Sequence, residues 1–207
     1  MTERGRAGRA RLEKRLATAS HGALLLDRKD RILADELERL RLQEDRAREE
    51  WERCAREAAI WLVRTAALDG RARIASAAPA ELAEVVVTWG GAVGVAYPEE
   101  VSCTPPVAPP SGGSSALTFS AAAHRAAVRA GVRYAGVRRA IALISAELSA
   151  TRVRRRAIEQ RWIPRLQDNL TTVRHELDEQ ELEETLRLRW ASAPRRESTA
   201  ASTPGGV

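Results

Sequence analysis

"LEKRLATASHGALLLDRKDRILADELERLRLQ", residues 12–43, decides the fold of this chain. Its apolar side chains recur at alternating spacings of four and three residues, and this spacing keeps one face of a helix against a partner helix. The alternation continues to residue 68, and only Asp30, Glu44 and Thr65 interrupt it. A repeat of 3.5 residues held over about eight heptads predicts a left-handed coiled coil, because a straight helix would rotate its apolar face away from the partner. The apolar members of this first seam are Leu12, Leu16, Ala19, Ala23, Leu26, Leu33, Leu37, Leu40, Ala47, Trp51, Cys54, Ala58, Trp61 and Leu68.

A second seam occupies the C-terminal part of the chain. Between Trp162 and Leu170 two consecutive spacings of four form a stutter, which relaxes the supercoil locally. Pro164 lies inside it, although a proline in a helix interior removes a hydrogen bond and clashes with the preceding turn. Two interpretations stay open: Pro164 kinks a continuous helix, or it begins a separate helix at the first position. The second seam consists of Tyr134, Val137, Ile141, Ile144, Leu148, Thr151, Arg155, Ile158, Trp162, Leu166, Leu170, Val173 and Leu177.

These two seams predict an all-α protein in which two long helices pair antiparallel within one chain. The apolar supply is mostly Ala, Leu and Val, and only eight of the 207 residues are aromatic, so a narrow helix seam is favoured over a thick globular core. We expect five segments in order: a disordered N-terminus (1–8), an N-terminal coiled-coil helix (9–70), a middle region (71–119), a C-terminal coiled-coil helix (120–190) and a disordered tail (191–207).

The middle region differs in composition from the two helices. Gly70 is a plausible helix stop, and "AAPAEL" predicts a short helix beginning near Pro79. The stretch "EVVVTWGGAVGVAYP" predicts a β-hairpin with Gly90 and Gly91 between its two strands. The proline-rich residues 102–116 predict a partly extended loop, and the second long helix should begin near Ser120, with Thr118 or Ser120 as its N-cap.

The charge pattern favours a charged helix surface. The formal net charge is +6, but 28 carboxylates are interspersed with the 34 basic residues, of which only Lys14 and Lys29 are lysines. A basic coiled-coil protein that binds nucleic acid is an alternative, suggested by "RVRRRAIEQR", and a filament-like structural dimer is another. We expect no nucleic-acid partner, because the interspersed carboxylates are typical of a charged helix surface rather than a polybasic tract. We expect no direct membrane insertion, because no stretch has the length and apolarity of a membrane-spanning helix or a signal peptide.

No residue pattern indicates catalysis. The histidines His21, His124 and His175 lack the spacing of a catalytic triad or a metal site, and Cys54 and Cys103 lack that of a zinc site. The sequence therefore predicts no enzyme, no cofactor and no metal. Among the five tryptophans, Trp51, Trp61 and Trp162 fall on the seams, where wide side chains are usually core. Trp89 and Trp190 are better placed to contact another protein chain.

Three stretches resemble the D subunit of the V/A-type rotary ATPases. They are "GALLLDRKDRIL" (22–33), "GAVGVAYP" (91–98) and "AIEQRWIPRLQDNLTTVRHELDEQELEETLRLR" (157–189), in which Ile163, Pro164, Arg165 and Leu166 match the family pattern outright.

The resemblance also has departures. The basic cluster of the family usually reads L-L-K-x-K-R-D-x-L, whereas here Asp27 replaces the first lysine, Asp30 and Arg31 invert the later order, and only Lys29 keeps its place. Arg155 and Arg156 stand where Val-Asn is common.

The resemblance implies a central-stalk rotor component, without catalysis of its own, that couples ATP hydrolysis or synthesis to proton or sodium translocation. The implied partners are the catalytic A and B subunits of the head, the F subunit of the stalk and the connector above the membrane ring. The implied location is the cytoplasmic face of the membrane. The candidate partner contacts are Lys29, Arg31, Ile163, Pro164, Arg165, Trp89 and Trp190.

Overall fold

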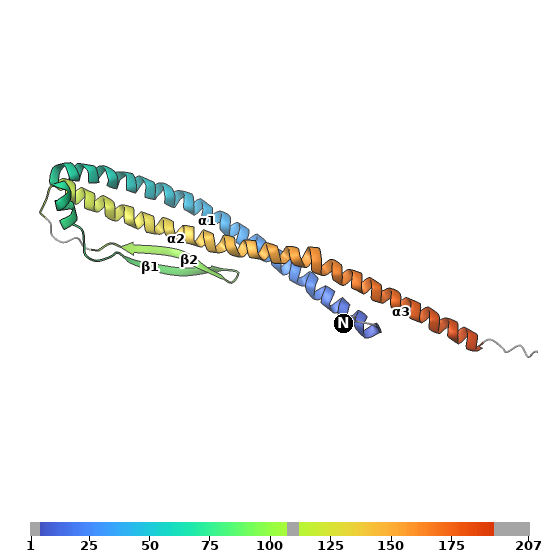
Figure 1. The fold of residues 1–207 in the computed structure, drawn as a ribbon. Coiled ribbons are helices and arrows are strands. Elements are labelled where there is room, and N and C mark those ends of the chain that lie inside the picture. The colour runs from blue at the N-terminus through green and yellow to red at the C-terminus, as the bar shows by residue number, and fades with distance from the viewer. Residues whose placement is uncertain (1–4, 107–111, 193–207) are drawn as a thin grey trace, which may run out of the picture. The chain divides into compact units, whose positions relative to one another are not determined.

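The computed structural model describes residues 5–106 and 112–192 of the chain. Its elements, in chain order, are α1 (Gly5–Ser76), β1 (Glu84–Ala92), β2 (Val95–Thr104), α2 (Ser115–Ala157), the π-helix η1 (Ile158–Trp162) and α3 (Ile163–Ser192) (Figure 1). The predicted all-α fold, with long paired helices and a hairpin in the middle region, is confirmed. The chain divides into a middle unit, Ala23–Arg156, and a terminal unit, Met1–Gly22 with Ala157–Val207.

In the middle unit α1 and α2 pair antiparallel. Leu33 and Ile144 are fully buried in the core between the two helices. Early residues of α1 contact late residues of α2, as in the ion pair between Asp30 and Arg152, whereas Thr65, late in α1, bonds to Ala116, early in α2. Figure 1 shows the two helices of this unit side by side. The core cluster consists of Leu33, Leu37, Leu40, Tyr97, Ala140, Ile144 and Leu148.

The three polar positions of the first seam each find a partner on α2. Asp30 Oδ1 lies 2.8 Å from Arg152 Nε, and Glu44 Oε1 lies 3.8 Å from Arg138 Nε. The Thr65 hydroxyl lies 3.0 Å from the Ala116 carbonyl oxygen. Because a buried polar group is costly only when it lacks a partner, these interruptions are compatible with the coiled coil.

The terminal unit repeats the antiparallel pairing with its own core. Leu12 belongs to one buried cluster with four side chains of α3, and the partly buried Leu16 and Ala19 pack against this cluster. An ion pair of 3.1 Å between Glu13 and Arg174 joins the two helices at the surface. The α3 members of this core are Leu166 and Leu170, which lie in the stutter, and Val173 and Leu177, which follow it.

The hairpin turn lies elsewhere than predicted. Ala92 pairs with Val95, so the turn consists of Val93 and Gly94, whose φ angles are 48° and 83°. Two positive φ angles are what a two-residue type I′ turn requires. The prediction that Gly90 and Gly91 form the turn is wrong, since both pair inside the strand.

The connections flanking the hairpin also differ from prediction. Gly70 has φ 76° and ψ 163°, so the short helix of this region is residues 71–76, directly after Gly70. The predicted short helix near Pro79 is wrong, because residues 77–83 are not helical. β2 runs on to Thr104, so the loop after it is shorter than residues 102–116.

Both long helices begin earlier than predicted. Helix α2 begins at Ser115 rather than Ser120, because Asp69 anchors the start of the helix by accepting a hydrogen bond of 3.1 Å from the Ser114 backbone N–H. Helix α1 begins at Gly5 rather than residue 9, and its first turn contacts α3 through an ion pair of 3.1 Å between Arg6 and Glu181. Residues 1–4, 107–111 and 193–207, for which we predicted disorder or an extended loop, lie outside the described residues.

The backbone remains helical on both sides of Pro164. Ala157 (φ −63°, ψ −38°) and Ile163 (φ −61°, ψ −51°) flank the five-residue π-helix η1, and Pro164 is the second residue of α3. The Ile163 N–H donates to the Ile158 carbonyl, five residues back. The wider π turn leaves room for the proline ring, which would clash with the carbonyl four residues back in a regular α-helix. A π-helix therefore accommodates Pro164, without the chain break that a separate helix would need.

Candidate functional site

The contact surfaces of the described residues are the candidate functional sites considered below. Within residues 5–106 and 112–192 no three His, Cys, Asp or Glu side chains gather in a way that could hold a metal ion. The rings of His21, His124 and His175 are exposed, and both cysteines are free thiols. None of the described helices combines the length and apolarity needed to cross a membrane.

A charged layer joins α1 and α2 in the middle unit. Asp30 is 9% exposed and accepts hydrogen bonds from Arg152 (2.8 Å) and Arg155 (3.3 Å). Asp27, one turn earlier on α1, accepts a bond of 2.7 Å from Arg155. These four residues, which we call the charged layer, place two carboxylates against two guanidinium groups across the helix interface. Buried ionic groups that satisfy one another this way fix the register of a coiled coil.

The charged layer explains three residues that differ from the family pattern described above. They are Asp27 and Asp30 on α1 and Arg155 on α2. In the structure Arg155 contacts both aspartates. Asp30 and Arg155 are seam positions in the sequence, but their pairing was not predicted. Their opposite charges on two antiparallel seams could have indicated that they pair.

Two of the predicted partner contacts, Lys29 and Arg31, lie beside the charged layer. Lys29 Nζ bonds to Glu147 Oε1 of α2 at 2.7 Å, and this hydrogen bond lowers the pKa of Glu147. Arg31 pairs with Asp27 at 2.6 Å, and its side chain is exposed. Lys29 is thus engaged within the chain, whereas Arg31 remains accessible to a partner.

A buried tyrosine fastens the hairpin to α1. The Tyr97 hydroxyl donates to Glu36 Oε1 at 2.6 Å, and Arg39 contacts both residues. The Arg39 hydrogen bond lowers the pKa of Glu36, while burial and then the Glu36 carboxylate raise the pKa of Tyr97. This contact could not be predicted from the sequence, because its members are far apart in the chain and belong to no motif.

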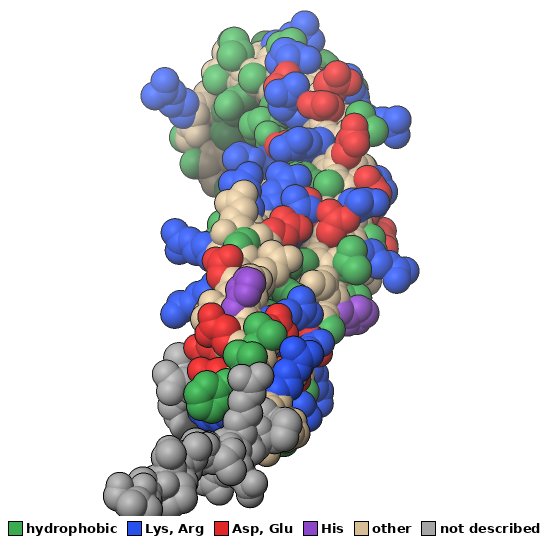
Figure 2. Space-filling view, turned by 90° about the vertical axis from the view of Figure 1, so that its right-hand side faces the viewer, with side chains coloured by type: hydrophobic (Ala, Val, Ile, Leu, Met, Phe, Trp, Pro, Cys, Tyr) green, Lys and Arg blue, Asp and Glu red, His purple; other side chains and the backbone are tan. Residues whose placement is uncertain are grey.

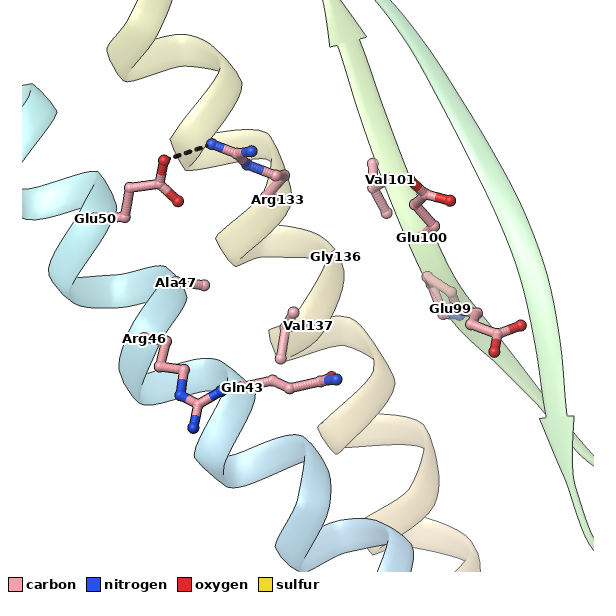
Figure 3. A pocket seen from close by; sticks show the side chains of 11 residues that line it. Gln43, Arg46, Ala47, Glu50, Glu99, Glu100, Val101, Arg133, Gly136 and Val137 are labelled. Atoms are coloured by element: carbon pink, nitrogen blue, oxygen red, sulfur yellow. Dashed lines mark hydrogen bonds and ion pairs between the residues drawn. The ribbon is translucent and has the colours of Figure 1, made fainter.

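Beyond Tyr97, β2 passes over α2 and leaves a hollow between hairpin and helices. Val101 packs so closely on Gly136 that a Cβ at Gly136 would lie 2.4 Å from a Val101 methyl carbon. Figure 3 shows this hollow, of about 340 Å³, with the ion pair of 2.7 Å between Glu50 and Arg133 on its helical wall. Glu99 and Glu100 of β2 are the acidic residues of the opposite wall. Its mixed charges are suited to polar contacts.

Strand β1 is the exposed side of the hairpin. Trp89, a predicted partner contact, is 60% exposed. Its neighbours along the strand, Val85, Val86 and Val87, are exposed as well. Strand β1 pairs only with β2 among the described residues, so its outer edge is accessible. This surface fits a partner that adds apolar contacts to the hairpin.

An apolar groove lies where α1, the connection to the hairpin and α2 meet. Its volume is about 400 Å³, and apolar side chains make up most of its lining. Glu81, His124 and Arg125 are the polar residues along it that can ionise. Large apolar grooves of this kind mark sites for partner proteins on soluble surfaces. Its principal apolar residues are Leu62, Ile74, Leu82, Pro106, Leu117 and Val128.

In the terminal unit a second hollow adjoins the predicted contacts Ile163, Pro164 and Arg165. Pro164 and Arg165 are exposed, and Ile163 is half-buried. Trp162 is 54% exposed and lines the hollow together with Ile158, so the prediction that Trp162 is a core residue is wrong. A π-helix has more residues per turn than an α-helix, so the side chains of this segment point in other directions than the heptad pattern indicates. The indole of Trp162 therefore points away from the seam. Lys14 and Thr18 of α1 complete the rim.

The remaining tryptophans differ in exposure. Trp190 is exposed near the end of α3. Trp51 stacks on Tyr134 at 5.6 Å, and Trp61 stacks on Phe119 at 4.8 Å. Trp51 and Trp61 are thus ring contacts at the edge of the helix pair, not the fully buried core residues that their seam positions indicated.

Positive and negative side chains alternate over the helices. The face in Figure 2 shows Lys and Arg side chains interspersed with Asp and Glu. Five of the nine arginines of α2 contact carboxylates: Arg133, Arg138, Arg152, Arg154 and Arg155. This pattern gives the surface many weak polar contacts rather than one continuous basic stripe.

Comparison with protein families gives a match over most of the chain. Residues 9–193 match a family described as the D subunit of ATP synthase. A search among curated proteins finds no match.

Proposed function

The chain belongs to the D-subunit family of ATP synthases, and we propose that it is the central rotor shaft of a V/A-type rotary ATPase. In this role it couples ATP hydrolysis or synthesis in the catalytic head to proton or sodium translocation. The family match over residues 9–193 is the observation that carries the proposal. Each of the two units contains an antiparallel helix pair with interhelical ion pairs and a narrow core, which is the kind of structure that resists bending.

The terminal unit is the part that we assign to the head, which consists of the A and B subunits. Its helices carry many exposed charged side chains, and each exposed ion pair contributes about 1 kcal/mol or less. Weak contacts of this kind exchange easily as the head passes through its nucleotide states. The exposed residues Pro164 and Arg165, beside the Trp162 hollow, are the candidate contacts in this unit.

The middle unit is the part that we assign to the F subunit of the stalk and to the connector above the membrane ring. The exposed β1 surface around Trp89 fits the F subunit, and the apolar groove at the connection fits an apolar segment of the connector. In the complex the chain would lie at the cytoplasmic face of the membrane as a peripheral, non-catalytic component.

A nucleic-acid-binding coiled coil is the rival function. The interspersed carboxylates that pair with five α2 arginines weigh against it, because they leave these arginines in a surface of mixed charge rather than in a continuous basic stripe. If the chain bound nucleic acid through phosphate contacts, its affinity for DNA or RNA would also fall steeply as the salt concentration rises.

Reconstitution with the A, B and F subunits tests the proposal. The full chain, labelled with a bead through a cysteine on the hairpin, should assemble with the head and rotate when ATP is added. Duplex DNA and RNA at moderate salt are the matched alternative ligands. Failure to assemble with the head, or tight salt-sensitive binding to nucleic acid, would refute the rotor assignment.

A further inference from the structure

The Trp162 hollow lies between α1 and η1, and both of its sides belong to the terminal unit. Its volume is about 520 Å³, and its lining is mostly apolar. Sites for small organic molecules have volumes of this order and linings of this kind. The residues that line the hollow are Lys14, Arg15, Thr18, Ala19 and Gly22 of α1 and Ile158 and Trp162 of η1.

The hollow exists because small residues of α1 lie opposite large residues of η1. Ala19 and Gly22 are three residues apart, so they lie on the same side of α1. A Cβ atom at Gly22 would have no neighbour within 4 Å, so the space beside it is open. On the other side Ile158 and Trp162 are the first and last residues of the π-helix. The indole of Trp162 therefore forms an accessible aromatic wall.

The charge at the rim of the hollow is positive. Lys14 and Arg15 are its ionisable residues, and none of the seven described residues that line it carries a carboxylate. The Lys14 side chain is exposed and has no ion-pair partner in the described part of the chain. Lys29, the other lysine of the chain, is by contrast bonded to Glu147. The Lys14 ammonium is thus available to an anionic ligand at the edge of an apolar cavity.

We propose that the Trp162 hollow binds a small aromatic anion. A flat ring system would stack on the indole of Trp162, and a carboxylate, sulfonate or phosphate group on the ring would accept hydrogen bonds from Lys14. This binding site goes beyond the rotor function and does not depend on it.

Other occupants fit the hollow less well. A lipid surface is contacted by protruding apolar side chains, whereas Ala19 and Gly22 are small residues between two helices. A protein partner would have to fill the hollow with a side chain. No unmodified amino acid combines a flat ring with a negative charge at neutral pH, because the tyrosine hydroxyl has an ordinary pKa of about 10. A small molecule with both features is complementary to the wall and the rim together.

The test uses two probes that differ in charge alone. Anilinonaphthalene sulfonate is an aromatic anion, and phenylnaphthylamine has the same rings without the sulfonate. Fluorine NMR of the full chain labelled with fluorotryptophan reports each of the five indoles separately, and Trp162→Phe identifies the resonance of Trp162. We expect the sulfonate to shift this resonance saturably and to bind about threefold or more tighter than the uncharged probe.

Three variants separate the apolar and the ionic parts of the site. Gly22→Leu fills the open space and should weaken both probes by about tenfold or more. Lys14→Gln should weaken the sulfonate alone, by about threefold. Ala17→Leu is the matched control, because Ala17 is exposed and lies about 140° around α1 from Gly22. Circular dichroism checks that all three variants retain their helix content.

Two results would overturn the inference directly. One is equal binding of the probes by the Gly22→Leu variant and the unmodified chain, because the ligand would then lie outside the hollow. The other is equal affinity of the unmodified chain for the two probes, because the ligand would then need no charge.

The remaining occupants are tested with the same Trp162 resonance. A shift caused by phosphatidylglycerol vesicles would assign the hollow to a lipid surface, and a shift caused by raising the protein concentration would assign it to a second copy. Loss of the sulfonate response after assembly with the A and B subunits would assign it to the head. Each of these outcomes overturns the inference. Failure to assemble with the head would refute the rotor proposal alone, because the titrations use the isolated full chain.

Discussion

The Nη1 atom of Arg155 lies 3.3 Å from Oδ2 of Asp30, so the charged residues that interrupt the two hydrophobic seams contact each other. Each would be costly to bury alone, because an ion pays a large desolvation penalty in a helix interface. Together with Asp27 and Arg152 they form a layer that is satisfied only when the two helices are in the observed register. The layer therefore selects one alignment of the coiled coil.

The first prediction concerns this layer. Asp30→Asn and Arg155→Gln should each lower the free energy of unfolding by about 1–3 kcal/mol, because each removes charged hydrogen bonds from a poorly accessible part of the helix interface. The double variant should cost less than the sum of the two single costs. Urea denaturation gives these values. Arg31→Gln, which removes an exposed ion pair, should change stability by roughly 0.5 kcal/mol or less, and equal costs for Arg31→Gln and Asp30→Asn would contradict the assigned role.

A pair of glycine variants tests how closely the hairpin packs on α2. Gly136→Ala should weaken the docking of the hairpin, because the new Cβ would lie 2.4 Å from a methyl carbon of Val101. The expected cost is about 1–3 kcal/mol, which is typical of overpacking. Gly22→Ala is the control, since its Cβ would have no neighbour within 4 Å and alanine favours a helix by up to about 1 kcal/mol. Thermal unfolding should therefore shift in opposite directions for the two variants, and a stabilising Gly136→Ala would show that the hairpin is not held against α2.

The contact between Tyr97 and Glu36 predicts a stability that depends on pH at both extremes. The pKa of Glu36 is below its ordinary value of 4.5, so its contribution is present above that pH and is lost as pH falls through the folded-state pKa. The pKa of Tyr97 is above its ordinary value of 10.0, so its contribution is present below pH 10 and is lost as pH rises through the folded-state pKa. Urea titrations across pH should show Glu36→Gln converging with the unmodified chain in acid and Tyr97→Phe converging with it in alkali. Curves that stay parallel at all pH values would exclude the contact.

Pro164→Ala tests whether the π-helix matters for rotation. Alanine restores a backbone N–H and removes the ring clash, so η1 should relax toward a regular α-helix and rotate the helix face that carries Arg165. If the resulting asymmetry of the shaft contributes to coupling, the torque of the reconstituted complex should fall while assembly with the head is retained. Single-molecule rotation assays measure this torque. An unchanged torque would remove the asymmetry hypothesis and leave Pro164 a structural feature only.

Crosslinking checks the intramolecular pairing in the terminal unit. Glu13→Cys with Arg174→Cys, in a Cys54→Ala and Cys103→Ser background, should form a bismaleimide crosslink within one chain, because the native side chains meet at 3.1 Å. Moving the second cysteine to Glu184 places it ten residues, about 15 Å, farther along α3 and should abolish the crosslink. A crosslinked dimer in place of the crosslinked monomer would favour a filament-like assembly.

The sequence by itself determined the two long helices, because a heptad pattern is local and places an apolar residue at every turn. It also determined their antiparallel pairing, because two such seams in one chain can meet only if the chain folds back on itself. It also indicated that Asp30, Glu44 and Thr65 are exceptional and that Pro164 lies at a change of periodicity. The place of the hairpin turn could not be predicted from the sequence, since Gly90 and Gly91 satisfy local turn chemistry better than Val93 and Gly94 do.

Tertiary contacts decided the rest. The bond from Tyr97 to Glu36 holds the strand that follows the turn, and Asp69 anchors the start of α2, so partners distant in the chain chose between local alternatives. The role of Arg155 also depends on tertiary contacts. In the sequence it is a charged residue at a position where the seam is otherwise apolar. In the folded chain it forms ion pairs with Asp27 and Asp30, and these pairs fix the register of the two helices.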